Sequence, residues 1–131
     1  MKTTRIDTSS LAESSRMLKA FADPVRLRLL NLLSEDAEIC VCHLHEALEL
    51  PQSTVSRHLA YLRKTGLVNG RKEGLWVHYR LVKARSKLHA NLLNAVEESL
   101  GELETFRQDR RRLERLIDIF QTNIRIQIHE E

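Results

Sequence analysis

The sequence is poor in aromatic residues and has no long apolar run. Phe, Trp and Tyr make up only 5% of its 131 residues, so the predicted core is aliphatic and mostly helical. No stretch approaches the ~20 apolar residues that span a bilayer, which excludes a predicted transmembrane helix. The polar start, residues 1–11, lacks the apolar core of a signal peptide. We therefore expect a cytoplasmic chain with no membrane partner.

Cysteine is equally scarce, and the two cysteines, Cys40 and Cys42, lie one residue apart. We expect free thiols, because the cytoplasm is reducing and a disulfide at this spacing closes a strained ring. In an extended segment both side chains point to one side and can chelate an ion together. In a regular helix they point about 200° apart, so chelation predicts non-helical backbone at Cys42.

The position of Cys42 near a predicted helix start should lower the pKa of its thiol and favour the thiolate. The alternative role for both cysteines is that of small buried apolar side chains.

Patterns typical of catalysis are missing. Residues 43–48, after Cys42, contain no Arg or Gly that would cradle an anion, and no acid–base pair or Gly-rich phosphate loop occurs elsewhere. We therefore expect no enzyme.

Charge is distributed unevenly along the chain. Residues 32–50 contain several acidic groups and neither Lys nor Arg, whereas residues 51–80 contain six basic groups against Glu73 alone. A basic block this compact indicates a polyanionic partner such as nucleic acid. The alternative is a solvated basic surface without a partner.

Caps and apolar spacing predict a series of helices in the first half. Ser9 or Ser10 can begin a helix that runs to about residue 22, and Asp23-Pro24 can begin the next. Residues 39–41 look extended and lead into a short helix that ends before Pro51. The following helix has one apolar face, formed by Val55, Leu59 and Leu62, and ends at Gly66. Two short helices joined by a tight turn form a helix-turn-helix pattern.

A β-hairpin follows, because apolar and polar residues alternate over residues 75–81 after a basic tip that contains glycine. A hairpin after a helix-turn-helix is a wing. The predicted fold is therefore mainly α with a small β-hairpin, a winged helix-turn-helix. Residues 1–100 form the DNA-binding and sensing domain in this prediction.

Residues 101–131 are predicted as a helical extension and tail after a break at Gly101. The apolar faces exceed the needs of one small core, so we expect a homodimer that the extension supports. An arginine cluster in the extension fits a solvated helix face better than nucleic-acid contact: Arg107, Arg110, Arg111, Arg112 and Arg115. The tail, Ile124 to Ile128, alternates like a strand against the partner, or frays.

The helix after Pro51 carries side chains suited to reading base edges in the major groove of double-stranded DNA. These predicted base readers are Gln52, Ser53, Thr54, Ser56, Arg57 and His58. The predicted phosphate contacts are Arg63, Lys64, Arg71 and Lys72. Ser53 can instead cap the helix, Thr54 and Ser56 can serve solubility alone, and His58 can be an ordinary packing residue.

Three segments together resemble the ArsR/SmtB family of winged-helix transcriptional repressors over about residues 10–100. They are the Cys-Val-Cys of residues 40–42, the residues 55–68 around Ser56-Arg57-His58-Leu59, and residues 71–81. The resemblance implies a cytoplasmic homodimer that represses a resistance operon by binding operator DNA. It also implies release of the operator when a metal or metalloid binds, and it is strongest toward arsenic-responsive members.

The identity of the ion stays open. Arsenic-responsive members often have a third cysteine at the position of His45. As(III) or Sb(III) bound by Cys40 and Cys42 is the first prediction. The alternative is Cd(II) or Zn(II) held by Cys40, Cys42 and His45, or with His43 as the imidazole. A third possibility is a redox sensor in which the two thiols are oxidised.

Overall fold

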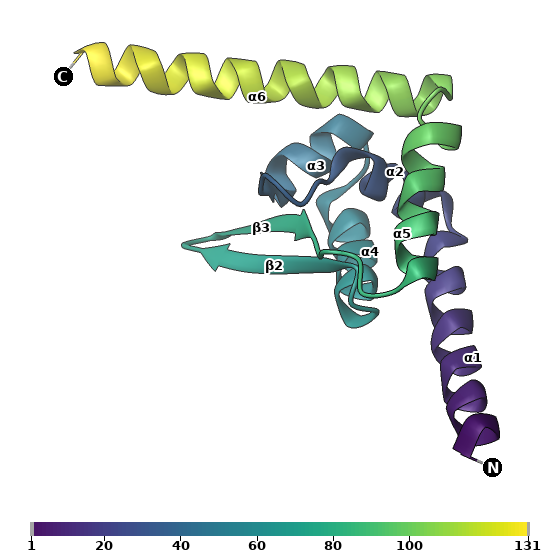
Figure 1. The fold of residues 1–131 in the computed structure, drawn as a ribbon. Helices are drawn as coiled ribbons and strands as arrows, with labels where there is room; N and C mark the ends of the chain where they lie inside the picture. Colours follow the sequence, from purple (N-terminus) through teal and green to yellow (C-terminus); the bar gives the residue numbers. More distant parts are fainter. Residues whose placement is uncertain (1, 131) are drawn as a thin grey trace.

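The computed structural model describes the backbone of residues 2–130 and the side chains of residues 10–127. Helices dominate, and three short strands form the only sheet of that part of the chain (Figure 1). The predicted mainly α fold with a winged helix-turn-helix is confirmed. In chain order the elements are α1 (Lys2–Phe21), α2 (Pro24–Leu32), β1 (Ile39–Cys40), α3 (Val41–Leu48), α4 (Gln52–Lys64), β2 (Val68–Glu73), β3 (Trp76–Leu81), α5 (Lys87–Asn94), the π-helical turn η1 (Ala95–Leu100) and α6 (Glu104–Glu130).

Local sequence signals set the bounds of α2 and α4. Asp23 caps α2, where its carboxylate accepts hydrogen bonds from the backbone N–H of Val25 and Arg26 at 2.9 and 3.1 Å. After the C-terminal end of α4, Gly66 adopts a left-handed φ of 80°. There the N–H of Leu67 donates to the carbonyl of Leu62 at 2.9 Å, which is the closing bond of a Schellman motif.

The core is aliphatic, as the composition predicts. Leu29, Leu44, Leu59, Leu62 and Leu67 are completely buried. They come from α2, α3, α4 and the turn that leads into β2, so these elements share a single core. The recognition candidates on α4 are therefore held on a rigid support rather than on a loop.

The sheet is antiparallel with the strand order β1-β3-β2, so the wing carries a third strand that the hairpin prediction did not include. In its register Cys40 faces His78, and Arg71 faces His78 from the other side. The extended segment predicted at residues 39–41 is confirmed for Ile39 and Cys40 only, because the helix α3 already begins at Val41.

Both ends of the chain are more helical than predicted. The helix α1 begins at Lys2 rather than at Ser9 or Ser10, and α6 runs without interruption to Glu130. The tail from Ile124 to Ile128 is thus neither a strand nor a frayed end, and that prediction was wrong. No Gly or Pro occurs between residues 104 and 130, so nothing stops the helix once it has begun.

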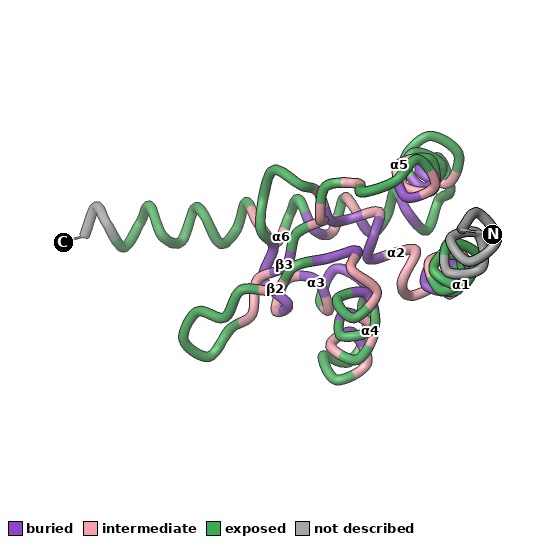
Figure 2. The backbone as a smooth tube through the Cα atoms, turned by 60° about the horizontal axis from the view of Figure 1, so that its bottom comes forward, coloured by how far each residue is buried: buried purple, intermediate pink, exposed green. Residues whose placement is uncertain are grey.

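The second half of α6 extends beyond the rest of the molecule on the same side as the tip of the wing (Figure 1). Every described residue from Asp118 to Gln127 is exposed (Figure 2). The first half packs on α3 and α2, with Phe106 and Leu113 buried. The predicted break at Gly101 lies at the corner between η1 and α6, where a Cβ atom would collide with the carbonyl oxygen of Glu97.

Candidate functional site

The polar face of α4 presents the candidate base readers. Gln52, Ser53 and Arg57 are exposed, whereas Thr54 and Ser56 are half-buried. Pro51 is the N-cap residue, and no side chain makes a capping hydrogen bond at this end of the helix. The alternative role of Ser53 as the cap is therefore not seen. Two of the predicted phosphate contacts, Arg63 and Lys64, are exposed in the last turn of the same helix.

His58 lies on the inner side of α4 and is only 14% exposed. Its Nδ1 atom is 3.4 Å from Nη1 of Arg26 and 3.8 Å from the carboxylate of Asp23. Burial lowers the pKa of His58, and the Asp23 carboxylate partly opposes that shift. The structure thus places His58 against the start of α2, as a packing residue would lie, and away from the exposed readers.

The two basic candidates of the wing differ in their surroundings. Lys72 is exposed, whereas Arg71 is held between two carboxylates. Its Nε atom donates to Glu38 at 2.9 Å, and its Nη2 atom donates to Glu73 at 2.9 Å. These two ion pairs compete with a phosphate contact by Arg71, whose Nη1 atom they leave unused.

The two cysteine sulfur atoms meet at the N-terminus of α3 and form a disulfide, with the two Cα atoms 5.1 Å apart. The sequence predicted free thiols, whereas in this structure the two cysteines are bonded to each other. Cys40 is the N-cap residue with extended backbone, φ −64° and ψ 140°, and its sulfur accepts a hydrogen bond from the N–H of Cys42 at 3.2 Å. The extended backbone at Cys40 alone turns its side chain over the first turn of the helix.

This geometry also corrects the prediction about Cys42. Its backbone is helical, because α3 begins at Val41, and yet the two sulfur atoms are in contact. The expected angle of about 200° applies only when both residues are helical. A pair made of one cap residue and one first-turn residue therefore brings the thiols together without unwinding the helix.

Neither histidine of α3 joins the two sulfur atoms. The Nδ1 atom of His45 is 3.2 Å from the carbonyl oxygen of Leu50, at the far end of the helix. The ring of His43 packs edge-on against Phe120 of α6, with centroids 5.3 Å apart. Burial lowers the pKa of His43, and a nearby His78 lowers it further, against the opposing effect of Glu46. Among the described residues no three His, Cys, Asp or Glu side chains converge on a metal position.

His78 is the residue that sequence reasoning missed at this site. It faces Cys40 across the sheet, and its Nε2 atom lies 3.7 Å from a carboxylate oxygen of Glu73. The alternation over residues 75–81 identified its strand, but nothing in the sequence indicated that the two-residue strand β1 pairs with it. The two thiols and the wing are therefore direct neighbours.

The arginine cluster of α6 divides into two arginines that bond to the rest of the fold and three that are exposed. Arg112 donates to the carbonyl oxygen of Ala47 at 2.6 Å and to the fully buried Asp109 at 2.6 Å. Arg110 donates to Asn31 at 2.6 Å and to the carbonyl oxygen of Gly101 at 2.8 Å. These two arginines join α6 to α3 and α2, whereas Arg107, Arg111 and Arg115 are exposed, as a solvated face would be.

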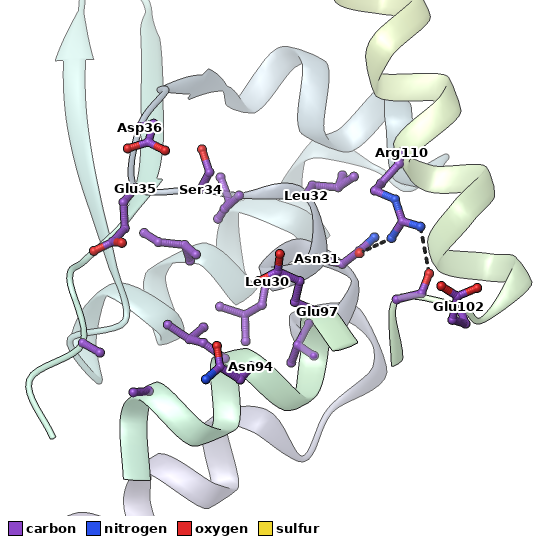
Figure 3. Close-up of a pocket in the computed structure, with 17 residues that line it drawn as sticks. Leu30, Asn31, Leu32, Ser34, Glu35, Asp36, Asn94, Glu97, Glu102 and Arg110 are labelled. Carbon is purple, nitrogen blue, oxygen red and sulfur yellow. Dashed lines mark hydrogen bonds between the residues drawn. The ribbon is translucent and has the colours of Figure 1, made fainter. Parts of the chain in front are cut away.

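The Arg110 bonds close one end of an open cleft of about 700 Å³ between α2 and the α5–η1 segment (Figure 3). Its lining includes leucines of α2 and α5 and the acidic side chains of Glu35, Glu97 and Glu102. None of the residues predicted to bind DNA or an ion lines this cleft. It is separate from the thiol pair.

Comparison with known proteins gives the family. Residues 23–70, from the cap of α2 to the start of the wing, match the family described as "Bacterial regulatory protein, arsR family". An HTH-type transcriptional regulator of Methanocaldococcus jannaschii is 45% identical over 75 residues, which are 57% of this chain and 84% of that protein. The chain belongs to the arsR family. The predicted family is thereby confirmed, and the chain is a DNA-binding transcriptional regulator rather than an enzyme.

Two other arsR-type relatives have names that refer to an ion. The arsenical resistance operon repressor of Escherichia coli is 53% identical over 66 residues, 50% of this chain and 56% of that protein. A cadmium resistance transcriptional regulatory protein homolog of Staphylococcus aureus is 36% identical over 67 residues, 51% of this chain and 55% of that protein. The chain thus spans little more than half of each.

Solved structures agree with the arsR fold. Reduced HlyU from Vibrio cholerae superposes with a TM-score of 0.59 at 39% sequence identity, and the matched region covers 71% of this chain and 94% of the HlyU chain. The homodimeric winged helix-turn-helix DNA-binding domain Mb0332 of Mycobacterium bovis superposes with a TM-score of 0.59 at 29% identity, over 75% of this chain and 91% of its own. No helix within residues 2–130 is long and apolar enough to cross a membrane.

Proposed function

We propose that this arsR-family regulator is a repressor that binds operator DNA as a homodimer and leaves it when As(III) or Sb(III) binds Cys40 and Cys42. The observation that carries the proposal is the contact between the two sulfur atoms at the N-terminus of α3. The name of the Escherichia coli relative supports the choice of ion, and the homodimeric neighbour from Mycobacterium bovis supports the dimer. A soft metalloid suits thiolate ligands.

The position of the thiol pair supports coupling to DNA. The helix α3 carries both cysteines at its start and packs against α4, the helix with the exposed base readers. Cys40 also belongs to β1, which pairs with β3 of the wing. A change at the thiols can therefore displace both predicted DNA-contacting elements.

An ion releases DNA only to the extent that it binds the DNA-free conformation more tightly than the DNA-bound one. The helix α3 has little freedom at its C-terminus, where Arg28 and Arg112 bond the carbonyls of Leu48 and Ala47. We therefore expect its N-terminus to move when an ion separates the two sulfur atoms. This movement does not require the non-helical backbone that the sequence predicted at Cys42.

The test measures release of a DNA fragment that the protein has selected from a random pool. Wild-type protein, reduced beforehand, should lose the fragment on titration with arsenite, as followed by fluorescence anisotropy. Cys40→Ser and Cys42→Ser should bind the fragment normally and keep it in arsenite. His45→Gln serves as the matched control and should respond like the wild type if two thiolates hold the metalloid. Normal release from both serine variants would refute the proposal.

A redox function is the second candidate, and the disulfide itself favours it. In that case oxidation of the two thiols, with loss of two protons and two electrons to a peroxide, would release the DNA. Peroxide and arsenite applied to parallel samples separate the candidates. Release by peroxide but not by arsenite would favour the redox function.

A third candidate is a Cd(II)- or Zn(II)-responsive repressor that uses Cys40, Cys42 and an imidazole. The name of the Staphylococcus aureus relative supports it. The predicted imidazole of His45 is engaged with Leu50 and does not meet the sulfur atoms in this structure. A divalent ion therefore needs either a rearrangement of His45 or a different histidine.

A further inference from the structure

The sheet places one histidine directly beside the thiol pair. Cys40 and His78 are opposite one another in the antiparallel pair of β1 and β3. Side chains at directly opposite positions lie on the same face of a sheet, with Cβ atoms about 4.5–5.5 Å apart. The His78 side chain is 25% exposed, so it is accessible yet held by its surroundings.

The other contacts of His78 resemble the outer shell of a metal-bound imidazole. A histidine that binds a metal through one ring nitrogen commonly offers the other N–H to a carboxylate. Here Nε2 of His78 lies 3.7 Å from a carboxylate oxygen of Glu73. Glu73 is itself fixed by Nη2 of Arg71 at 2.9 Å. In a site shared with Cys40, Nδ1 would be the ring nitrogen that binds the ion.

The other two nearby histidines have different roles. His45 is directed to the carbonyl oxygen of Leu50, and His43 packs on Phe120. Both belong to α3, and the ring of His43 also contacts α6. His78 is the only one of the three that belongs to the strand paired with Cys40.

We propose that His78 supplies the imidazole ligand of a two-thiolate, one-imidazole site that accepts Zn(II) or Cd(II) together with Cys40 and Cys42. The proposal rests on the thiol site of the proposed function and adds its third ligand. Zinc sites accept mixed Cys and His ligands, whereas a soft metalloid gains little from imidazole. His78 would thus favour divalent ions without contributing to the binding of As(III).

The site must be reduced before it can bind. In this structure the sulfur atoms are bonded to one another, and no three metal-binding side chains converge among the described residues. A small-molecule dithiol supplies the two electrons and two protons that open the disulfide and is itself oxidised to a disulfide. Binding of the divalent ion then displaces the two thiol protons to solvent.

The experiment titrates the reduced 131-residue chain with Cd(II) alone, after removal of the reductant. Thiolate-to-metal absorption reports affinity, and X-ray absorption at the cadmium edge reports the ligands. We expect two sulfur scatterers and a nitrogen scatterer in the wild type. His78→Gln should lose the nitrogen scatterer and bind Cd(II) about 10-fold or more weakly, since even outer-shell changes cost 10- to 100-fold. Glu73→Gln should weaken binding by less than His78→Gln and retain the nitrogen scatterer.

His45→Gln is the matched control and should keep both the affinity and the nitrogen scatterer. As(III) titration of His78→Gln should match the wild type. Ring-nitrogen NMR shifts of His78 in the ¹⁵N-histidine-labelled wild type give a measurement that does not depend on folding of a variant. We expect its Nδ1 signal, and not that of His45, to shift when Cd(II) is added.

The outcomes separate this proposal from the function on which it rests. If Cys40→Ser and Cys42→Ser lose Cd(II) binding while His78→Gln binds Cd(II) like the wild type, the role of His78 is overturned and the thiol site stands. Unchanged Cd(II) binding in the two serine variants overturns the thiol site as well. A nitrogen scatterer lost in His45→Gln and kept in His78→Gln would assign the third ligand to α3 instead.

Discussion

Arg28 of α2 and Asp109 of α6 form a bidentate ion pair, in which Nε and Nη2 of the arginine lie 2.8 and 2.9 Å from the two carboxylate oxygens. Asp109 is completely buried, and Arg112 donates to it as well. Hydrogen bonding to Asp109 raises the pKa of Arg28, so the guanidinium stays charged. Since both arginines also bond carbonyls at the end of α3, Asp109 fixes the C-terminus of the helix that carries the thiols.

Replacement of Asp109 should therefore be one of the most destabilising changes in the chain. Asp109→Ala leaves two arginines without their shared partner, and breaking a buried ion pair costs about 3–5 kcal/mol. Urea unfolding followed by circular dichroism measures the loss. The matched control is Glu104→Ala, whose exposed carboxylate pairs with Arg107 and Arg111 at 3.7 and 3.9 Å. It should cost under about 1 kcal/mol, and equal losses in the two variants would contradict the role of Asp109.

The role of Asp109 also shows the limit of sequence reasoning for this fold. Acidic and basic residues alternate along residues 104–118, a pattern typical of a solvated helix face. Burial of Asp109 depends on where α6 crosses α2, and that crossing is a tertiary property without a local pattern. The helices, by contrast, follow from apolar spacing and caps such as Asp23, which act within a few residues.

The candidate site likewise has residues whose placement the sequence predicted and residues whose placement it did not. The exposure of the predicted readers Gln52, Ser53 and Arg57 follows from the position of the helix after Pro51. The contact of Cys40 with His78 does not, because a strand of two residues has no alternation to recognise. The bonding of Cys40 to Cys42 was not predicted because a reducing cytoplasm and ring strain at this spacing favoured free thiols. The helical backbone at Cys42 was missed because we treated both residues as having one backbone conformation. The tail from Ile124 was misread because its alternation over a few residues outweighed the absence of a helix breaker.

The turn after α4 offers a paired test of backbone and steric cost. Gly66→Ala should destabilise the protein, since a Cβ at this left-handed position costs about 1–2 kcal/mol and also displaces the guanidinium of Arg85, at the end of a flexible side chain, from the Gly66 carbonyl to which it donates. Gly74 at the wing tip has a similar φ of 61°, but nothing lies within 4 Å of its Cβ position. Gly74→Ala should therefore show only the backbone cost. Thermal unfolding of the two variants compares them, and a larger loss for Gly74→Ala would contradict this explanation.

His89 predicts a dependence of stability on pH. The side chain is completely buried, its Nδ1 atom accepts the N–H of Arg85 at 3.2 Å, and burial lowers its pKa. A neutral His89 therefore stabilises the fold fully above its unfolded pKa of about 6.5. That stability is lost as the pH falls through the lower pKa of the folded state, because the unfolded chain takes up the proton first.

His89→Asn provides the comparison, because its amide oxygen can accept the same N–H without titrating. Urea unfolding at about pH 7.5 and about pH 5.5, on either side of the unfolded pKa, should show a smaller drop for the variant than for the wild type. Part of the drop should remain, since burial also lowers the pKa of His43 and His58. An equal drop in both proteins would assign the pH dependence to groups other than His89.

Arg57, an exposed arginine in the first half of α4, gives the sharpest test of the predicted DNA surface. If Arg57 reads a base edge, Arg57→Ala should weaken binding of the selected DNA by about 1–3 kcal/mol and relax the sequence preference. Lys64→Ala should instead weaken binding to all sequences and reduce the salt dependence, as loss of a phosphate contact does. Arg115→Ala removes the same charge from the exposed face of α6 and should change neither property. Fluorescence anisotropy at several salt concentrations measures all three, and a loss for Arg115→Ala equal to that for Arg57→Ala would mean that net charge, and not the α4 surface, governs binding.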